Sequence, residues 1–285
     1  MTITPTDKEI SQQLEAEIEP WLTHMKWRPD FAKWREGRIW QEKKQARNLD
    51  TLRLFLRLAT LKDDLRGKKI LDLGCGMGGF STALALEGAQ VQPYDYNRAY
   101  CRITRLRGMR YNLSFSPVNG AGEALPFPNA HFDHIVCLDV LEHVQNPEKL
   151  LSEISRCLKP GGVCFITAIN RFAFSDPHYH VRFVNWLPRC FAESAMKLLR
   201  RDKDNSRFGD RQTLNEMHYY RYDQLSSLTA RHGFTGIREL GELELATRTY
   251  SGVKGLFKKS GLLRPVYLLY RYFYKGTYQL MVVKR

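Results

Sequence analysis

The chain has 285 residues, of which 43% are hydrophobic and 26% charged, with 20 glycines and 12 prolines. This composition excludes collagen-like, low-complexity and disordered chains, and it suits one large α/β domain with additions. The formal net charge of +14 comes from 44 basic and 30 acidic residues and points to an anionic partner or surface.

Targeting and redox signals are weak. The apolar run 266–270 is too short for a transmembrane helix, and residues 1–7 lack the basic and apolar regions of a signal peptide. The six cysteines show no Cys-x-x-Cys pair and no zinc-like spacing, and most lie in apolar segments. We therefore expect a cytoplasmic protein with reduced, mostly buried cysteines and no metal site.

The chain divides into two predicted parts. Residues 1–66 carry helix-spaced apolar side chains and are predicted as a helical N-terminal extension, whereas 67–285 alternates short apolar runs with amphipathic segments, as α/β domains do. The predicted strands are 69–73, 90–94, 113–117, 133–138, 163–168, 234–240 and 278–283, with a helix over 222–232. Two insertions are expected in this domain, a partly helical cap over 169–221 and a basic aromatic segment over 241–276.

Two local signals refine these bounds. Pro93 is expected to mark the end of the second strand, because proline is poorly tolerated in a central strand. Asn146 is a natural N-cap and Pro147 suits the first helical position. The helix that they begin carries an apolar face through Leu158, and Pro160-Gly161-Gly162 is expected to end it.

A glycine-rich segment, Asp72-Leu73-Gly74-Cys75-Gly76-Met77-Gly78-Gly79, follows the first predicted strand. Its glycines allow a sharp turn and the close approach of a nucleotide, and Asp95 could accept ribose hydroxyls in either a dinucleotide or an adenosyl site. Asp72 separates these sites, because a carboxylate there repels a pyrophosphate but attracts the ammonium of a methionine moiety. The segment thus favours S-adenosylmethionine over NAD, and a connector without a ligand is the alternative.

Five segments in order carry a resemblance to a known family: Ile70–Gly79, Glu123–Phe127, Phe132–Val136, Leu141–Val144 and Leu158–Gly162. Together they resemble class I S-adenosylmethionine-dependent methyltransferases, especially the ubiquinone/menaquinone-type subgroup. The resemblance covers roughly 50–170 and the end strands. It implies an α/β, Rossmann-like fold with a seven-stranded, mostly parallel sheet and helices on both faces, and S-adenosyl-L-methionine as cofactor.

The resemblance also implies cofactor-binding residues. They are Asp72, Gly74, Gly76 and Gly78 around the methionine part, Asp95 at the ribose, Tyr96, Ala121 and Gly122 at the adenine, and Leu138 and Asp139 on the methionine side. Ala121 departs from the subgroup, which usually carries an aspartate there. Adenine would therefore rely on backbone groups, and the loss of one hydrogen bond costs about 0.5–1.5 kcal/mol.

The acceptor site is expected under the cap insertion, because ligands of such folds bind beyond the carboxyl ends of the strands. Methyl transfer to a hydroxyl needs a base, and an imidazole changes its protonation near neutral pH. The candidate bases are His178, His180 and, as an alternate, His218, although each could equally be a packing or surface residue. Glu142 and His143 are expected to organise the fold or close the cofactor pocket, with a catalytic His143 as the alternative.

The positive charge is unevenly distributed. Residues 251–285 carry eight basic and no acidic residues, so the remaining 250 residues contribute only +6. Seven aromatic residues are interleaved there, and Leu262–Lys275 is predicted as an aromatic, basic helix suited to a lipid headgroup boundary. A second basic cluster consists of Arg98, Arg102, Arg105, Arg107 and Arg110.

These observations favour methyl transfer, with oxygen as the expected acceptor atom and nitrogen and carbon left open. The acceptor is expected to be a small molecule, a lipid or a lipid-linked glycan, and segment 251–276 to contact an anionic membrane peripherally. One alternative is an RNA methyltransferase, against which stands the lack of an appended RNA-binding motif. The others are an inactive methyltransferase-fold scaffold, and a C-terminal helix that packs its aromatics and exposes a solvated basic face.

Overall fold

The computed structural model describes residues 7–23, 26, 29–198 and 212–285, of which 253–255 are described by their backbone alone. The chain forms two compact units. The first comprises the residues up to 137 together with 156–164, and the second comprises 138–155 together with 165–285.

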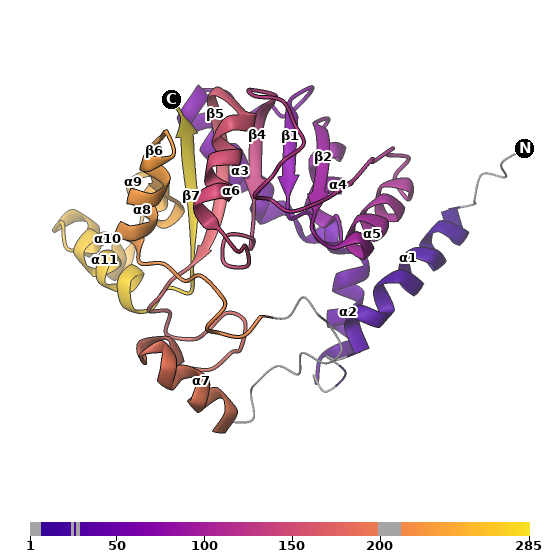
Figure 1. Ribbon diagram of the computed structural model, residues 1–285. Coiled ribbons are helices and arrows are strands. Elements are labelled where there is room, and N and C mark those ends of the chain that lie inside the picture. Colours follow the sequence, from indigo (N-terminus) through magenta and orange to yellow (C-terminus); the bar gives the residue numbers. More distant parts are fainter. Residues whose placement is uncertain (1–6, 24–25, 27–28, 199–211) are drawn as a thin grey trace, which may run out of the picture. The chain divides into compact units, whose positions relative to one another are not determined.

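Seven strands form one mixed sheet in the order β3-β2-β1-β4-β5-β7-β6 (Figure 1). The strands are β1 (Lys69–Leu73), β2 (Gln90–Asp95), β3 (Val118–Asn119), β4 (Phe132–Cys137), β5 (Leu158–Ile169), β6 (Phe234–Glu239) and β7 (Thr277–Lys284). β1 pairs in parallel with β2 and β4, β2 pairs in parallel with β3, and β6 pairs antiparallel with β7. The predicted Rossmann-like, mostly parallel seven-stranded sheet is confirmed. Its strand order reverses beside β1, where doubly wound sheets bind ligands beyond the carboxyl ends of their strands.

The helices of the first unit come before β1, between β1 and β2, and after β2 in the sequence. They are α1 (Asp7–Leu22), α2 (Phe31–Ile39), the 3₁₀ helix η2 (Gln41–Lys44), α3 (Ala46–Thr60), α4 (Gly79–Leu86) and α5 (Arg98–Met109). Leu14, Ile18 and Leu22 of α1 share a buried cluster with Met77 and Ile103. The N-terminal helices therefore pack on the glycine-rich loop and α5, and their description as a separate extension stays a prediction.

The second unit contains most of the insertions. Its helices are α6 (Pro147–Cys157), whose last two residues belong to the first unit, η3 (Val184–Trp186), α7 (Arg189–Leu198), α8 (Tyr222–Arg231), α9 (Leu240–Thr247), α10 (Gly252–Lys259) and α11 (Leu263–Phe273). The Asn146 side chain accepts the Lys149 N–H at 3.0 Å, so the predicted N-cap of α6 is confirmed. Part of the predicted cap, 199–211, lies outside the described residues.

The expectation for Pro93 is wrong, because β2 continues through it to Asp95 and pairs Pro93 with Asp72. The carbonyl of Tyr94 accepts the Gly74 and Cys75 N–H groups of the chain after β1, so the proline nitrogen faces the β3 side, where pairing starts only at Tyr94. The Gln92 side chain fills this gap by donating to the carbonyls of Pro93 (3.0 Å) and Ser116 (2.9 Å). A side-chain amide thus replaces the ladder bond that proline cannot donate.

Two other boundaries differ from the prediction. The third strand is the short β3, not 113–117, because Phe115 is buried against Gly108 of α5 and Pro117 lacks an N–H for the ladder. The helix that begins at Pro147 ends at Cys157, and Leu158 together with Pro160-Gly161-Gly162 already belongs to β5.

The structure also bears on the predictions for membrane-spanning helices and for the cysteines. Among the described residues, no helix combines the length and the apolar character that a bilayer crossing requires. All six cysteines are free and five of them are buried, whereas Cys190 is exposed.

Candidate functional site

The glycine-rich loop turns sharply between β1 and α4. Gly74, Gly76 and Gly78 all adopt positive φ angles, of 76°, 53° and 76°. A Cβ on Gly78 would lie 2.8 Å from the Thr104 Cα, so α5 packs too closely for any larger residue. A Cβ on Gly76 would point into open space, which leaves the backbone accessible to a ligand on that side.

The end of β2 holds this loop in place. The Tyr94 carbonyl accepts the Gly74 and Cys75 N–H groups at 2.8 and 3.0 Å. The buried carboxylate of Asp95 accepts the Gly76 N–H through Oδ2 and the Asn97 N–H through Oδ1, both at 2.8 Å. A carboxylate oxygen can accept more than one hydrogen bond, a property that suits Asp95 to the ribose hydroxyls expected there.

Asp72 is a buried acid beneath the loop. The Ser81 hydroxyl donates to its Oδ2 at 2.5 Å. Burial raises the pKa of Asp72 from 3.8 to about 6, an effect opposed by the Ser81 hydrogen bond and reinforced by the charge of Asp95. A buried carboxylate with this environment is stabilised by any cation that reaches it, which fits the ammonium inferred from the sequence.

A buried ion pair supports the loop from the other side. Arg107 is fully buried, pairs with Glu42, and donates to the carbonyls of Met77 (2.6 Å) and Ile39 (2.7 Å). Burial lowers the pKa of Arg107, and the charge of Glu42 opposes that effect. The side chain of Arg110 is also buried. Two of the five arginines of the second basic cluster are therefore buried, and these two do not add to a charged surface.

The remaining cofactor candidates belong to both units. Tyr96 is 76% exposed, and the carbonyl of Ala121 accepts the Tyr94 hydroxyl at 2.9 Å, with Gly122 in the turn that follows. Leu138 and Asp139 belong to the second unit, where Thr167 Oγ1 accepts the Asp139 N–H at 2.6 Å and donates to its carboxylate at 3.0 Å. The roles assigned to these five residues stay predictions.

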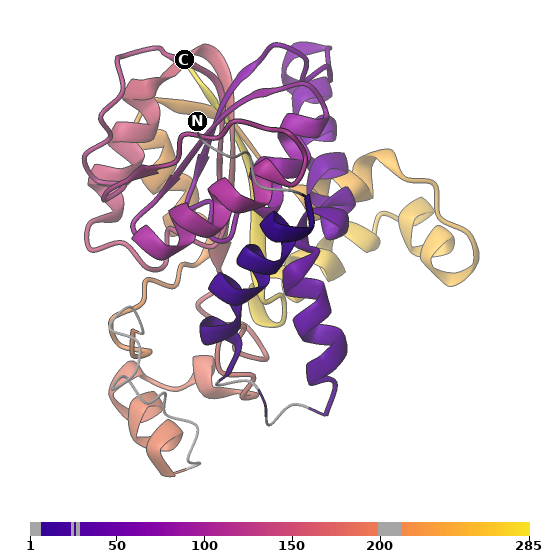
Figure 2. The ribbon, with the colours of Figure 1, turned by 90° about the vertical axis from the view of Figure 1, so that its right-hand side faces the viewer.

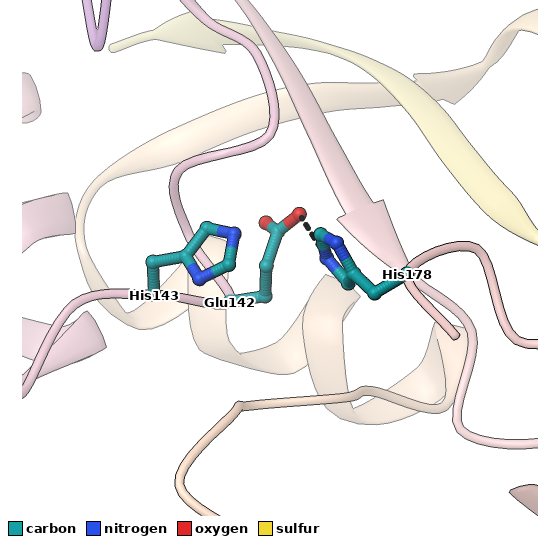
Figure 3. A group of neighbouring side chains, drawn as sticks. All are labelled: Glu142, His143 and His178. Atoms are coloured by element: carbon teal, nitrogen blue, oxygen red, sulfur yellow. Dashed lines mark ion pairs between the residues drawn. The ribbon is translucent and has the colours of Figure 1, made fainter. Parts of the chain in front are cut away.

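Three side chains of the second unit meet at one point, with His143 and His178 on either side of Glu142 (Figure 3). We call them the Glu142 cluster. His178 Nε2 lies 3.6 Å from Glu142 Oε1, and the two imidazole rings are 5.0 Å apart. His143 Nδ1 lies 2.9 Å from the side-chain oxygen of Gln212, whose amide donates back to the His143 carbonyl at 2.8 Å.

The Glu142 cluster carries unsatisfied polar atoms. Glu142 is almost completely buried, and among the described residues neither its Oε2 nor His178 Nε2 has a hydrogen-bond partner. One ligand atom from each of the three side chains lies within 4.8 Å of the others, close enough to share a proton or a cation. The expectation that the protein needs no metal stays a prediction.

Asp176, which was not among the residues predicted from the sequence, holds the backbone of the cap loop at His178. Asp176 is fully buried, and its Oδ1 accepts the N–H groups of His178 (2.9 Å) and Tyr179 (2.7 Å). Its Oδ2 accepts from Asn185 Nδ2 (3.0 Å) and the Tyr219 hydroxyl (2.8 Å). The Asp-Pro dipeptide at 176–177 was the available signal, because aspartates commonly bond the backbone two residues on in such turns.

Neither of the other two candidate bases belongs to the Glu142 cluster. His180 is exposed, at a positive φ of 56°. His218 donates its backbone N–H to the Glu142 carbonyl at 2.9 Å, while the residue lines a separate pocket of about 510 Å³ with Tyr220 and Arg231. Of the three predicted histidines, His178 is thus the one paired with a buried acid.

A family model for a methyltransferase domain matches residues 40–239. The chain belongs to the methyltransferase-domain family. This match confirms the resemblance drawn from the five segments.

Curated relatives include ubiquinone biosynthesis O-methyltransferases from Pseudomonas syringae pv. tomato and Idiomarina loihiensis. The first is 36% identical over 134 residues, which are 44% of this chain and 56% of the relative. The second is 38% identical over 110 residues, covering 38% of this chain and 45% of the relative. The chain thus spans about half the length of the curated relatives that it matches.

Solved structures share the fold of this methyltransferase-family chain. A Galdieria sulphuraria protein assigned as a sarcosine dimethylglycine methyltransferase has a TM-score of 0.53 at 16% identity, covering 84% of this chain and 85% of its own. The [4+2]-cyclase SpnF has a TM-score of 0.51 at 18% identity, covering 99% and 97%. Because the second is a cyclase, the shared fold does not by itself define an activity.

Proposed function

We propose that this protein transfers a methyl group from S-adenosyl-L-methionine to a hydroxyl oxygen of a small-molecule or lipid-like acceptor. The observation that carries the proposal is His178 beside the buried Glu142, on a loop of the cap insertion. The family membership and the names of the O-methyltransferase relatives support the same reaction.

The loop after β1 fits the cofactor. The open side of Gly76 gives a ligand access to the backbone, and Asp72 places a buried negative charge where an ammonium would be stabilised. Asp95, whose carboxylate accepts the Gly76 and Asn97 N–H groups at the end of β2, would hold the ribose hydroxyls. When bound, S-adenosylmethionine supplies an electrophilic methyl group on a sulfonium.

His178 is the proposed base. Its Nε2 would accept the proton of the acceptor hydroxyl as the oxygen–methyl bond forms and the sulfur–methyl bond breaks. Glu142, 3.6 Å from this nitrogen, would stabilise the imidazolium that results. Asp176 fixes the backbone of the loop at His178, so the loop is ordered before the acceptor binds.

The proposal also includes the location of the protein in the cell. We place the protein in the cytoplasm, with segment 251–276 as a peripheral contact on the inner face of an anionic membrane. A lipid or lipid-linked glycan would then be reached where it resides. The eight basic residues and absent acids of 251–285 support this contact.

The experiment measures transfer of a tritiated methyl group from S-adenosylmethionine to catechol as a water-soluble hydroxyl acceptor, and to lipid extracts in detergent. His178→Ala should lower the turnover roughly 100-fold, the usual contribution of a positioned base, and Glu142→Gln should lower it less. His180→Ala is the matched control and should keep full turnover. Equal losses in the two histidine variants, or full turnover in His178→Ala, would refute the base assignment.

A further inference from the structure

One helix of the second unit presents an apolar stripe to solvent. Leu262, at the N-cap of α11, and Val266, Leu269 and Phe273 within it follow a 4-3-4 spacing that places them on one side of the helix. These four side chains are 54%, 49%, 62% and 48% exposed, and no residue of α11 is buried. A helix of a globular protein normally turns such a stripe toward its core.

Polar contacts on the opposite side fix α11 in this orientation. Tyr267 donates to Glu239, and Arg271 pairs with Glu242 at 2.9 Å. The buried side chain of Asn170, just after β5, donates to the carbonyls of Arg271 (2.9 Å), Tyr272 (3.1 Å) and Lys275 (2.8 Å) and so closes the C-terminal end of the helix. The exposure of the stripe is therefore built into the fold.

The stripe continues into the cap insertion. The ring of Phe273 lies 6.3 Å from that of Trp186, which lies 5.3 Å from Phe183, and both cap residues are about half exposed. Phe174 also stacks on Tyr274 at 4.6 Å. We define the docking face as Leu262, Val266, Leu269, Phe273, Trp186 and Phe183. The same cap insertion carries His178.

The charge around the docking face selects its partner. Lys275 neutralises Glu239, and Arg271 pairs with Glu242. Arg264 of α11, which also lies 3.6 Å from Glu242, leaves this group with a net positive charge, and the exposed Lys259 adds to it. Tryptophan and tyrosine rings suit the boundary between headgroups and acyl chains, and basic residues are attracted to anionic lipids. A second copy of the chain is a less suitable partner, because it would bring the positive charges of two docking faces together. The stripe is also only about 16 Å long, which is short for a stable interface between proteins.

We propose that the docking face inserts into the headgroup boundary of an anionic bilayer and so presents the cap loop to lipid-borne acceptors. This deepens the proposed function and rests on it for the acceptor alone. Figures 1 and 2 show α10 and α11 in yellow, projecting from the strands β6 and β7 as an arm that can reach a surface.

The test is co-sedimentation of the full chain with vesicles of phosphatidylglycerol mixed with phosphatidylcholine, and with vesicles of phosphatidylcholine alone. Binding should require phosphatidylglycerol, and the double variant Leu269→Glu, Phe273→Glu should weaken it roughly tenfold or more. Leu61→Glu changes an exposed leucine at the end of α3 and is the matched control, expected to bind as the native chain does. Brominated lipids should quench Trp186, and Trp186→Phe should remove most of that quenching.

The outcomes separate docking from catalysis. Methylation of catechol and binding of S-adenosylhomocysteine should be unchanged in the double variant, because none of its residues belongs to the proposed site. Native binding to mixed vesicles by the double variant would overturn the proposal. Self-association of the native chain in sedimentation velocity, abolished by the same two substitutions, would assign the face to a second copy instead.

Discussion

Replacing Asp72 by asparagine should make the protein more stable and less able to bind its cofactor. Burial raises the pKa of Asp72 to about 6, against 3.8 for an ordinary aspartate. A difference of about 2 units corresponds to about 3 kcal/mol once the carboxyl is ionised in both states. Asp72→Asn removes this cost and keeps an oxygen that can accept the Ser81 hydroxyl.

The sign of the pH dependence follows from proton binding. Between the two pKa values the folded chain holds the Asp72 proton and the unfolded chain does not, so stability falls as the pH rises from about 4 to about 6. Asp72→Asn lacks this fall. The variant should therefore exceed the native chain by about 3 kcal/mol at about pH 8 and match it below about pH 4.

Urea unfolding of both proteins without cofactor, at several pH values, measures this difference. The comparison must be between variant and native chain, because burial also lowers the pKa of His134 to about 4, and that group makes the folded state less stable on acidification. The His134 contribution is common to both proteins and cancels. An Asp72→Asn chain that is less stable than the native one at about pH 8 would refute the reasoning.

Three further predictions concern other parts of the molecule. Glu42→Gln leaves Arg107 buried without its counter-ion and should lower the free energy of unfolding by about 3–5 kcal/mol, measured by urea titration, whereas Glu15→Gln in an exposed pair should change it by about 1 kcal/mol or less. Asp176→Asn should lower kcat for catechol and alter its pH profile while the affinity for S-adenosylhomocysteine stays unchanged, because the hydrogen-bond partners described for its carboxylate lie in the cap insertion that carries His178; an unchanged kcat and pH profile would contradict that role. Treatment with EDTA should leave turnover unchanged; a loss restored by a divalent metal would contradict metal independence and assign the Glu142 cluster as its ligands.

The sheet and the glycine-rich loop were predictable because their signals are local. The glycines at 74, 76 and 78 occupy the positive-φ positions that the turn requires, and Asp95 ends β2 as its spacing indicated. Pro93 misled because a neighbouring side chain, Gln92, supplies the missing ladder contacts. A prediction made from the proline alone cannot include hydrogen bonds that a neighbouring side chain donates in place of the missing N–H.

The candidate site was predictable only in part, because contacts between residues far apart in the sequence decide which side chains form it. The sequence could not choose between His178 and His180, with His218 as an alternate, and only the fold pairs His178 with Glu142, 36 positions earlier. The burial of Arg107 could not be predicted from its basic cluster, because its partner Glu42 lies 65 positions away in the sequence. Asp176 likewise gained its role from Tyr219, 43 positions further along the chain.

Calorimetric titration with S-adenosylhomocysteine tests the central claim most directly, with NADH as the competing ligand. The account predicts roughly micromolar binding of S-adenosylhomocysteine, no binding of NADH, and loss of the signal in Asp95→Ala. Asp95→Asn, which keeps an acceptor for a backbone N–H of the loop, separates lost ribose contacts from a misfolded loop. Binding of NADH without S-adenosylhomocysteine, or binding that survives in Asp95→Ala, would contradict the account.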